Sequence, residues 1–287
     1  MNWTSIAINI GIVLYILTIL AIIYTIILEN RNPVRTLAWI LVLVLVPGIG
    51  LFFYIYFGMN YRKIKMFSMK GLGDFKWLQY MSEDQKQRIK KAELLKKEDM
   101  EAVKPLMTLL LNNSKALLSR NNTIEILNNG EATFGSIFKA IAKAKKYIHL
   151  EYYIIDKGEL GEKLKELLIT KAKEGVEVRV IYDDVGSWKL PKRYIKEMKA
   201  AGIQIFPFLP VRFPLFTNKV NYRNHRKIVV VDGDTGFIGG LNFADRYLHG
   251  LPGIGIWRDT HLKVKGEAVT SLQVVFLFDW YFVRQEL

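Results

Sequence analysis

The residues best suited to chemistry lie between positions 222 and 242, which read YRNHRKIVVVDGDTGFIGGLN. His225 and Lys227 stand two positions apart, and Asp232 and Asn242 follow the histidine by 7 and 17 residues. An imidazole can attack phosphorus directly, an ammonium group stabilises charge on phosphate oxygens, and an amide donates a further hydrogen bond. This set is suited to phosphodiester chemistry that uses no metal and no cofactor.

The chain around this set predicts how its members meet. Residues 228–231 are apolar and β-branched and predict a buried strand, with His225 and Lys227 projecting to one side, about 7 Å apart. A turn at 232–234 then returns the chain and places Asn242 alongside His225. Asp232, the first residue of this turn, is counted with His225, Lys227 and Asn242 among the catalytic residues, although it is expected to fix the local turn rather than to touch substrate.

A His-x-Lys pair also occurs by chance at exposed strand edges, which is the alternative interpretation. His261 and Lys263 have the same spacing, but Ala268 stands where the full pattern has an aspartate. Only the copy at His225 has the complete pattern.

Strands and helices alternate along the chain from residue 123, because apolar residues follow strand-like and helix-like spacing in turn. Strands joined by helices at this spacing predict crossover units. We therefore predict an α/β fold with a mixed, largely parallel sheet flanked by helices. The predicted strands cover 123–127, 147–155, 176–182, 203–206 and 228–231, and the predicted helices lie at 134–142, 160–168 and 191–201.

Acidic side chains lie in or just after two of these strands. Ligands of such sheets bind beyond the carboxyl ends of the strands. Glu151 and Asp184 are therefore candidates for binding the phosphate group or the substrate, together with Lys227 and Asn242. The alternative is that the two acids cap the turns that follow their strands.

Residues 1–60 predict a two-helix transmembrane hairpin. Residues 5–28 carry no charge and would form a helix of roughly 36 Å, against roughly 30 Å of bilayer hydrocarbon; a cleaved signal peptide is the alternative. A second apolar run, 37–57, is interrupted by proline and glycine at 47–50, which predicts a kink. We expect a multi-pass protein of the bacterial cell membrane with both termini cytoplasmic, because basic residues are denser after the second run (Arg62, Lys63, Lys65, Lys70, Lys76) than in the connector (Arg31, Arg35).

The chain as a whole is basic and has no cysteine. Lys and Arg number 41 and Asp and Glu 27 in 287 residues, a net charge of +14. The apolar fraction of 51% excludes a disordered chain, and the missing cysteine excludes a disulfide-stapled domain, a thiol nucleophile and a Cys-ligated metal. Residues 61–118 predict a basic linker, whose amphipathic helix at 83–104 is either solvated or lies on anionic headgroups.

The pattern H-x-K-x4-D followed by G-G-x-N resembles the phospholipase D superfamily, and the chain as a whole resembles bacterial cardiolipin synthases. The second resemblance runs over essentially the whole chain but covers only the first half of that family's usual length. It rests on the hairpin residues Asn32–Arg35, Trp39, Pro47–Gly50 and Tyr54–Gly58, and on three later motifs: His149–Tyr153, Asp183–Ser187 and Trp257–His261.

The resemblance implies a two-step transfer between lipids. His225, as the nucleophile of the family's first motif, would take the phosphatidyl group of phosphatidylglycerol and release glycerol; the hydroxyl of a second phosphatidylglycerol would then displace the enzyme. Lys227 and Asn242 would bind the phosphate oxygens. A further carboxylate is needed to orient the imidazole, and Asp259 is our candidate, with a salt bridge to Arg258 as the alternative.

The same chemistry requires a second histidine to carry protons, and no second complete motif is present in the sequence. We therefore expect an amino-terminal fragment, or a short form that pairs with an identical copy, and a chain that is inactive alone. Its expected partners are phosphatidylglycerol, anionic membrane lipids and the missing carboxyl-terminal half or a homodimer mate, but no nucleic acid. The expected catalytic half-domain covers residues 119–287.

Residues 206–216 combine prolines with phenylalanines and are too apolar for an ordinary solvated loop. We expect them to dip into the membrane interface or to line the path of an acyl chain, or alternatively to pack against the domain. Three other functions stay open for the whole protein: a hydrolytic phospholipase D, a nuclease, and a non-catalytic membrane-anchored half-domain.

Overall fold

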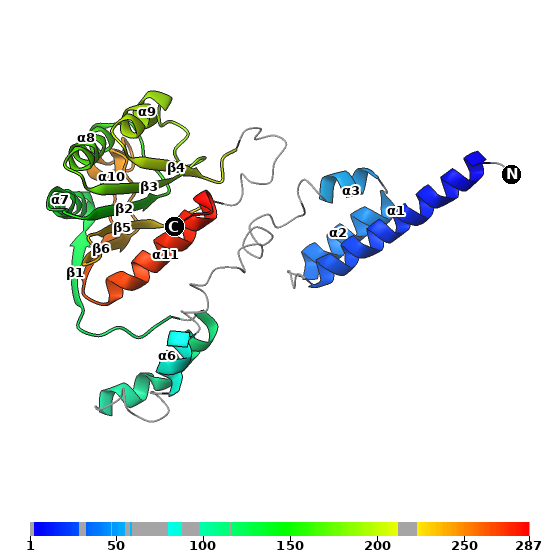
Figure 1. Cartoon of the computed structure of the whole chain (residues 1–287), viewed down its shortest axis with the longest axis horizontal. Coiled ribbons are helices and arrows are strands. Elements are labelled where there is room, and N and C mark those ends of the chain that lie inside the picture. The colour runs from blue at the N-terminus through cyan, green and yellow to red at the C-terminus, as the bar shows by residue number, and fades with distance from the viewer. Residues whose placement is uncertain are drawn as a thin grey trace. The chain divides into compact units, whose positions relative to one another are not determined.

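A computed structural model describes residues 3–28, 33–46, 48–54, 58, 80–87, 98–114, 116–211 and 223–286. The described residues divide into two compact units, one formed by the helices up to residue 58 and one formed by the residues from 80 onward (Figure 1).

The amino-terminal unit is a hairpin of α1 (Trp3–Leu28) and α2 (Pro33–Leu45) followed by the short α3 (Ile49–Phe53). The predicted break between the last two helices is confirmed: Gly48 has a φ of 81°, which favours glycine. A Cβ on Gly50 would lie 2.5 Å from the carbonyl oxygen of Val42, so the glycine permits a close backbone contact.

The interior of this hairpin is small. Ile26, Leu43 and Tyr54 are at most 4% exposed, whereas long aliphatic side chains on the outer faces, such as Ile8 and Leu14, are 62% and 59% exposed. Among the residues described in both backbone and side chain, no helix is long and apolar enough to cross a membrane. The transmembrane hairpin therefore stays a prediction.

Part of the predicted linker helix is present. Residues 80–87 are helical and α6 covers Glu98–Ser114, while the residues between them lie outside the described part of the chain. The two helical pieces pack together, because the hydroxyl of Ser82 donates to the carbonyl oxygen of Leu111 at 3.1 Å.

The globular unit is built on a seven-stranded sheet in the order β1-β7-β6-β5-β2-β3-β4. Only β2–β3 and β3–β4 pair in parallel; the other four neighbouring pairs are antiparallel. The prediction of a largely parallel sheet is thus wrong, although the sheet is mixed. Helices separate the parallel strands, whereas a tight turn joins β5 to β6. The strands are β1 (Thr123–Asn128), β2 (Tyr147–Tyr152), β3 (Glu177–Asp183), β4 (Gln204–Phe208), β5 (Lys227–Val231), β6 (Thr235–Gly239) and β7 (Thr260–Lys265).

Helices cover both faces of this sheet (Figure 1). The helices of the chain's middle lie on one face and α11 (Ala268–Arg284) lies on the other. Alternation along β2 divides its side chains accordingly: Leu150 and Tyr152 face the first layer, and His149 faces α11, where its ring stacks on Phe276. The first layer contains α7 (Asn129–Ala142), α8 (Glu159–Lys173), α9 (Lys192–Ala200) and α10 (Arg246–His249).

The segment 206–216 is described only as far as residue 211. Its first part continues β4, an edge strand, which is where a strand accommodates a proline such as Pro207. Phe208 is 1% exposed and stacks on Phe282 of α11. This part packs against the domain, and the expected membrane contact of Phe213 and Phe216 lies outside the described residues.

Candidate active site

His225 and Lys227 meet on one aromatic ring. The imidazole of His225 stacks on Tyr153 with 4.0 Å between ring centroids, and the Lys227 ammonium lies 5.4 Å from the centroid of the same ring. The ammonium also donates to the carbonyl oxygen of His225 at 2.6 Å. The two side chains therefore share one side of the chain, as the spacing predicts, and His225 is exposed toward solvent.

Asn242 lies against the same piece of chain as His225. Its Oδ1 accepts from the backbone N–H of Ile154 at 3.1 Å. Ile154 directly follows Tyr153, the tyrosine on which the imidazole of His225 stacks. Nδ2 of Asn242 donates to the hydroxyl of Tyr247 at 2.9 Å, and the side chain is buried. An amide nitrogen has two hydrogens, and the contacts among the described residues use one of them, which leaves the other for a ligand.

The charge of Asp259 acts on the pKa of Lys227. Partial burial lowers the pKa of Lys227, and the charge of Asp259 opposes that shift. The carboxylate lies over Gly240, where a Cβ would be 2.4 Å from its Oδ1. The same Oδ1 accepts from the backbone N–H of Thr260 at 2.6 Å. The predicted contact between Asp259 and His225 is not among the described contacts, and that role stays a prediction.

His261 lies beside Lys227 although the sequence pattern alone gave it no function. Ile228 pairs with Ile238, so the next register position sets Lys227 beside Gly239, which pairs in turn with His261. Because Gly239 has no side chain, the His261 ring occupies the space above it; a Cβ there would lie 2.2 Å from Nδ1.

The ring of His261 is 0% exposed, and neither of its nitrogens has a hydrogen-bond partner among the described residues. Burial, followed in the same direction by the charge of Lys227, lowers the pKa of His261 to about 4, while Asp259 acts in the opposite direction. The imidazole is therefore neutral at pH 7 and adds no charge beside the lysine.

Asp232 lies at the other end of β5 from Lys227. Its carboxylate accepts from the backbone N–H groups of Lys145, Lys146 and Tyr147 at 2.9, 2.7 and 3.0 Å. These bonds lower the pKa of Asp232 against the opposing effect of burial, which is the largest single influence. These bonds tie the end of β5 to the backbone at the start of β2, and a catalytic role for Asp232 stays a prediction.

The two acids predicted to bind substrate lie elsewhere. Glu151 is 1% exposed and receives a hydrogen bond from Asn224, on the face of β2 opposite to Tyr152. Asp184 accepts from the backbone N–H of Val211 at 2.7 Å and so holds a turn, as the alternative interpretation had it. Neither acid contacts His225 or Lys227 among the described contacts, because alternation along β2 turns Glu151 away from them.

Tyr153 supports the site but was not predicted from the sequence to take part in it, although a polar aromatic residue directly after a buried strand is a signal for a site at the strand's end. Among the described residues, no group of three or more His, Asp or Glu side chains is placed to hold a metal ion.

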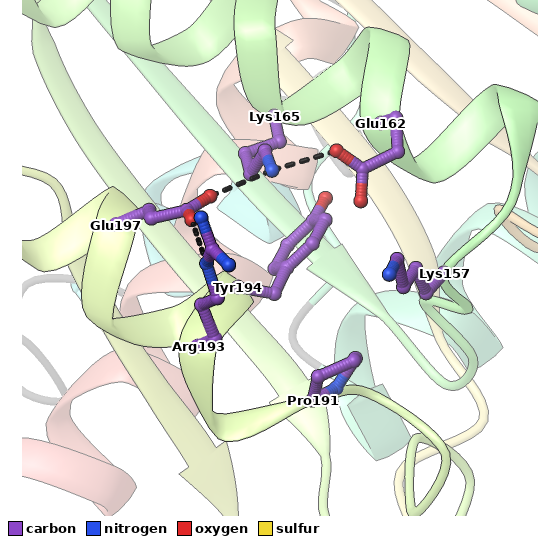
Figure 2. Close-up of a pocket in the computed structure, with 7 residues that line it drawn as sticks. All are labelled: Lys157, Glu162, Lys165, Pro191, Arg193, Tyr194 and Glu197. Atoms are coloured by element: carbon purple, nitrogen blue, oxygen red, sulfur yellow. Dashed lines mark hydrogen bonds and ion pairs between the residues drawn. The ribbon is translucent and has the colours of Figure 1, made fainter.

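A pocket of about 370 Å³ lies away from these residues, between α8 and α9 (Figure 2). Its charges are mostly satisfied internally: the Lys165 ammonium lies 2.6 Å from Glu162 and 2.8 Å from Glu197, and Arg193 also pairs with Glu197 at 2.8 Å. None of the predicted site residues lines this pocket.

Two family models match the chain. Residues 137–269 match the model described as "Cardiolipin synthase, PLD-like domain", and residues 16–58 match the one described as "Phospholipase_D-nuclease N-terminal". Residues 137–269 therefore belong to the phospholipase D-like family of domains, and the resemblance drawn from the motifs is confirmed.

The particular relatives are cardiolipin synthases. The chain is 46% identical over 266 residues to the cardiolipin synthase of Geobacillus sp., covering 93% of this chain and 52% of that protein. It is 47% identical over 262 residues to cardiolipin synthase 2 of Bacillus cereus, covering 90% and 49%. The chain thus spans about half the length of the curated relatives it matches. Among solved structures, Nuc from Salmonella typhimurium, a phospholipase D family member, matches with a TM-score of 0.43 and 18% identity over 57% of this chain and 97% of that chain.

Proposed function

We propose that this chain forms the amino-terminal, first-motif half of a membrane-bound cardiolipin synthase. The observation that carries the proposal is the meeting of His225 and Lys227 on Tyr153, in a chain about 45% identical to relatives with that name. An exposed imidazole beside a fixed ammonium group is suited to attack on a phosphodiester.

The proposed reaction has two balanced steps. A ring nitrogen of His225 attacks the phosphorus of phosphatidylglycerol, the bond to the glycerol oxygen breaks, and glycerol leaves with a proton supplied by a general acid. The hydroxyl of a second phosphatidylglycerol then gives its proton to that same group and attacks the phosphohistidine, which yields cardiolipin and frees the imidazole. Lys227 and the remaining amide hydrogen of Asn242 hold the phosphate oxygens, and Asp259 compensates the charge of the lysine.

In this proposal, no residue of the described site acts as the general acid. The second half of a longer protein or a second copy of this chain would supply it, as the half-length match to the relatives favours. The chain alone would then bind lipid without turnover.

A membrane location is the second part of the proposal. The amino-terminal hairpin would lie in the bilayer, with the globular unit on the cytoplasmic side. Its support is the apolar outer surface of α1 and α2, together with the amino-terminal family match over residues 16–58. In the globular unit, the loop before β7 also exposes apolar side chains: Leu251, Ile254 and Ile256 are 37%, 69% and 73% exposed.

This loop favours a lipid substrate over nucleic acid. Hydrogen bonds between Leu251 and Gly255 close it into a tight turn that holds both isoleucines outward, and it runs directly into Trp257 and Asp259. Apolar side chains beside a phosphodiester site are suited to acyl chains and not to a nucleic-acid backbone.

Product analysis tests the proposal. The protein is purified from its native membrane, so that any partner half stays with it, and is incubated with phosphatidylglycerol labelled in the glycerol headgroup. Cardiolipin and free labelled glycerol are expected, together with a trapped phosphohistidine at position 225 and no turnover in His225→Ala. Phosphatidic acid as the main product would assign hydrolysis instead, and full activity of His225→Ala would overturn the proposed nucleophile.

A further inference from the structure

We infer that Asp279, on α11, is a positioning residue that sets the direction of the His225 imidazole. The inference rests on the proposed role of His225 as nucleophile. It concerns α11, which covers the face of the sheet opposite to the one on which His225 contacts Tyr153. Asp279 is 7% exposed and lies within the buried face of α11.

Asp279 binds both neighbours of the histidine. Its Oδ2 accepts from Nδ2 of Asn224 at 3.3 Å and forms an ion pair with Nη1 of Arg226. One carboxylate oxygen thus joins the two residues that flank His225. The backbone N–H of Arg226 also donates to Oδ1 of Asn224 at 3.1 Å, which links the two flanking residues to each other.

Two further buried carboxylates hold the same segment. Asp183, 0% exposed, accepts from the backbone N–H of Asn224 at 2.9 Å and from Nη1 of Arg223 at 3.3 Å. Glu151 accepts from Nδ2 of Asn224. The residues before β5 are thus fixed by acids from β2, β3 and α11, although they belong to no strand themselves.

Extended chain explains how this anchoring reaches the imidazole. Side chains alternate along an extended segment, so when Asn224 and Arg226 are held toward α11, His225 and Lys227 must project to the opposite face. That is the face on which both contact Tyr153. Residues 223–226 precede β5 and are not assigned to a strand, so loss of the anchor at Arg226 should let this segment rotate and move the imidazole off the tyrosine.

A purely structural role, in which the Arg226–Asp279 pair only docks α11, makes a different prediction. In that case loss of the carboxylate would weaken the packing of α11 as a whole and would affect the His225 segment no more than the rest of the sheet. Removing Arg226 altogether would leave the buried Asp279 charge without its partner and would destabilise the fold, so the substitution at Arg226 must keep a cation.

The test compares Asp279→Asn, Asp279→Ala and Arg226→Lys with wild type and with the control Asp245→Asn. Asp279→Asn keeps the shape and an acceptor for Asn224 but removes the charge that holds Arg226. The control carboxylate accepts from the backbone N–H groups of Glu159 and Leu160 at 2.9 and 3.0 Å, a similar load outside the site. Each variant is purified in detergent from its native membrane, so that any partner half stays with it.

Two measurements do not depend on turnover. Amide hydrogen exchange follows residues 223–227 and α11 separately, and NMR follows the ring proton of His225, one of only four histidines. For Asp279→Asn we expect exchange in 223–227 to rise about tenfold with α11 unchanged, the His225 ring signal to lose its upfield stacking shift, and kcat to fall about 100-fold at constant KM. Arg226→Lys, which keeps a cation for the carboxylate, should retain most of the wild-type behaviour.

Three results would overturn the inference: an unchanged His225 ring signal in Asp279→Ala, exchange that rises equally in α11 and in 223–227, or the same changes in Asp245→Asn. The proposed function fails separately, if His225→Ala keeps its activity, whatever the exchange data show.

Discussion

The ring of Tyr153 lies parallel to the imidazole of His225, with 4.0 Å between centroids and 16° between planes. Tyr153 follows β2 directly and is followed by the residue that binds Asn242. One short piece of chain after β2 therefore supports both the proposed nucleophile and the proposed phosphate-binding amide.

Removing the aromatic ring should affect turnover more than removing its hydroxyl. Stacking of this kind contributes about 0.5–1.5 kcal/mol, so Tyr153→Ala should lower kcat about tenfold through disordering of the imidazole, and Tyr153→Phe should stay near wild type. Cardiolipin formation by the intact protein provides the measurement. A Tyr153→Phe variant as slow as Tyr153→Ala would show that the hydroxyl, and not the stacking, matters.

Asp259→Asn separates two roles of that carboxylate. The charge of Asp259 raises the pKa of Lys227 against the effect of burial, so its loss should lower the pKa of the ammonium further. The alkaline limb of the activity profile should then move to lower pH. If Asp259 instead orients His225, the second role predicted for it, kcat should fall while the alkaline limb stays in place.

Two glycine substitutions should have opposite effects on stability. In Gly239→Ala, the new Cβ would lie 2.2 Å from Nδ1 of His261 and 2.7 Å from its Cα, so the variant should lose about 1–3 kcal/mol of unfolding free energy. A Cβ on Gly135 in α7 would have no atom within 4 Å, so Gly135→Ala should gain about 0.5–1 kcal/mol. Denaturant titration of both variants checks this, and equal effects would contradict the contact with His261.

Two buried histidines should make the protein acid-sensitive. Burial lowers the pKa of His149 to about 4, and the charge of Arg179 acts in the same direction, while Glu177 and Gln273 oppose it; His261 also has a pKa of about 4. Between the ordinary value of 6.5 and about 4, each ring binds a proton only in the unfolded chain.

The stability contributed by each neutral ring is therefore complete above pH 6.5 and is lost as pH falls toward 4. The loss amounts to about 1.4 kcal/mol per pH unit for each histidine. His149→Phe keeps an aromatic ring between Tyr147 and Phe276 and should reduce the slope by about one half of the two-histidine value. Unfolding free energy measured at several pH values tests this; an unchanged slope would show that His149 does not titrate in this range.

The apolar turn before β7 should contact lipid. Ile254→Ser together with Ile256→Ser removes two exposed side chains without touching the buried core, so stability should change little while activity on lipid in vesicles falls. Activity on a short-chain, dispersed phosphatidylglycerol should be retained. Equal activity of the variant on vesicles would exclude the contact.

Residue types and their spacing are enough to predict the chemically active residues and most of the elements around them. The motif around His225 needs only residue types and spacing, and alternation along an extended chain places His225 and Lys227 on one side whatever the surroundings. Strands β1 to β5 and helices α7 to α9 were predictable for the same reason, because their periodicities are local properties of the chain, whereas β6, β7, α10 and α11 were not among the predicted elements.

The direction of the strands and the partners of the charges were decided by the tertiary structure. The turn at 232–234 specifies the antiparallel pair β5–β6, but the other three antiparallel pairs, β1–β7, β2–β5 and β6–β7, join strands far apart in the sequence that no local pattern brings together. Glu151 and Asp279 are far apart in sequence, yet both bind Asn224. Lys227 and His261 lie on either side of Gly239 in the sheet, and they come close because this glycine has no side chain. Contacts between distant residues depend on the register of the whole sheet and on how α11 packs against it, so spacing along the chain cannot reveal them.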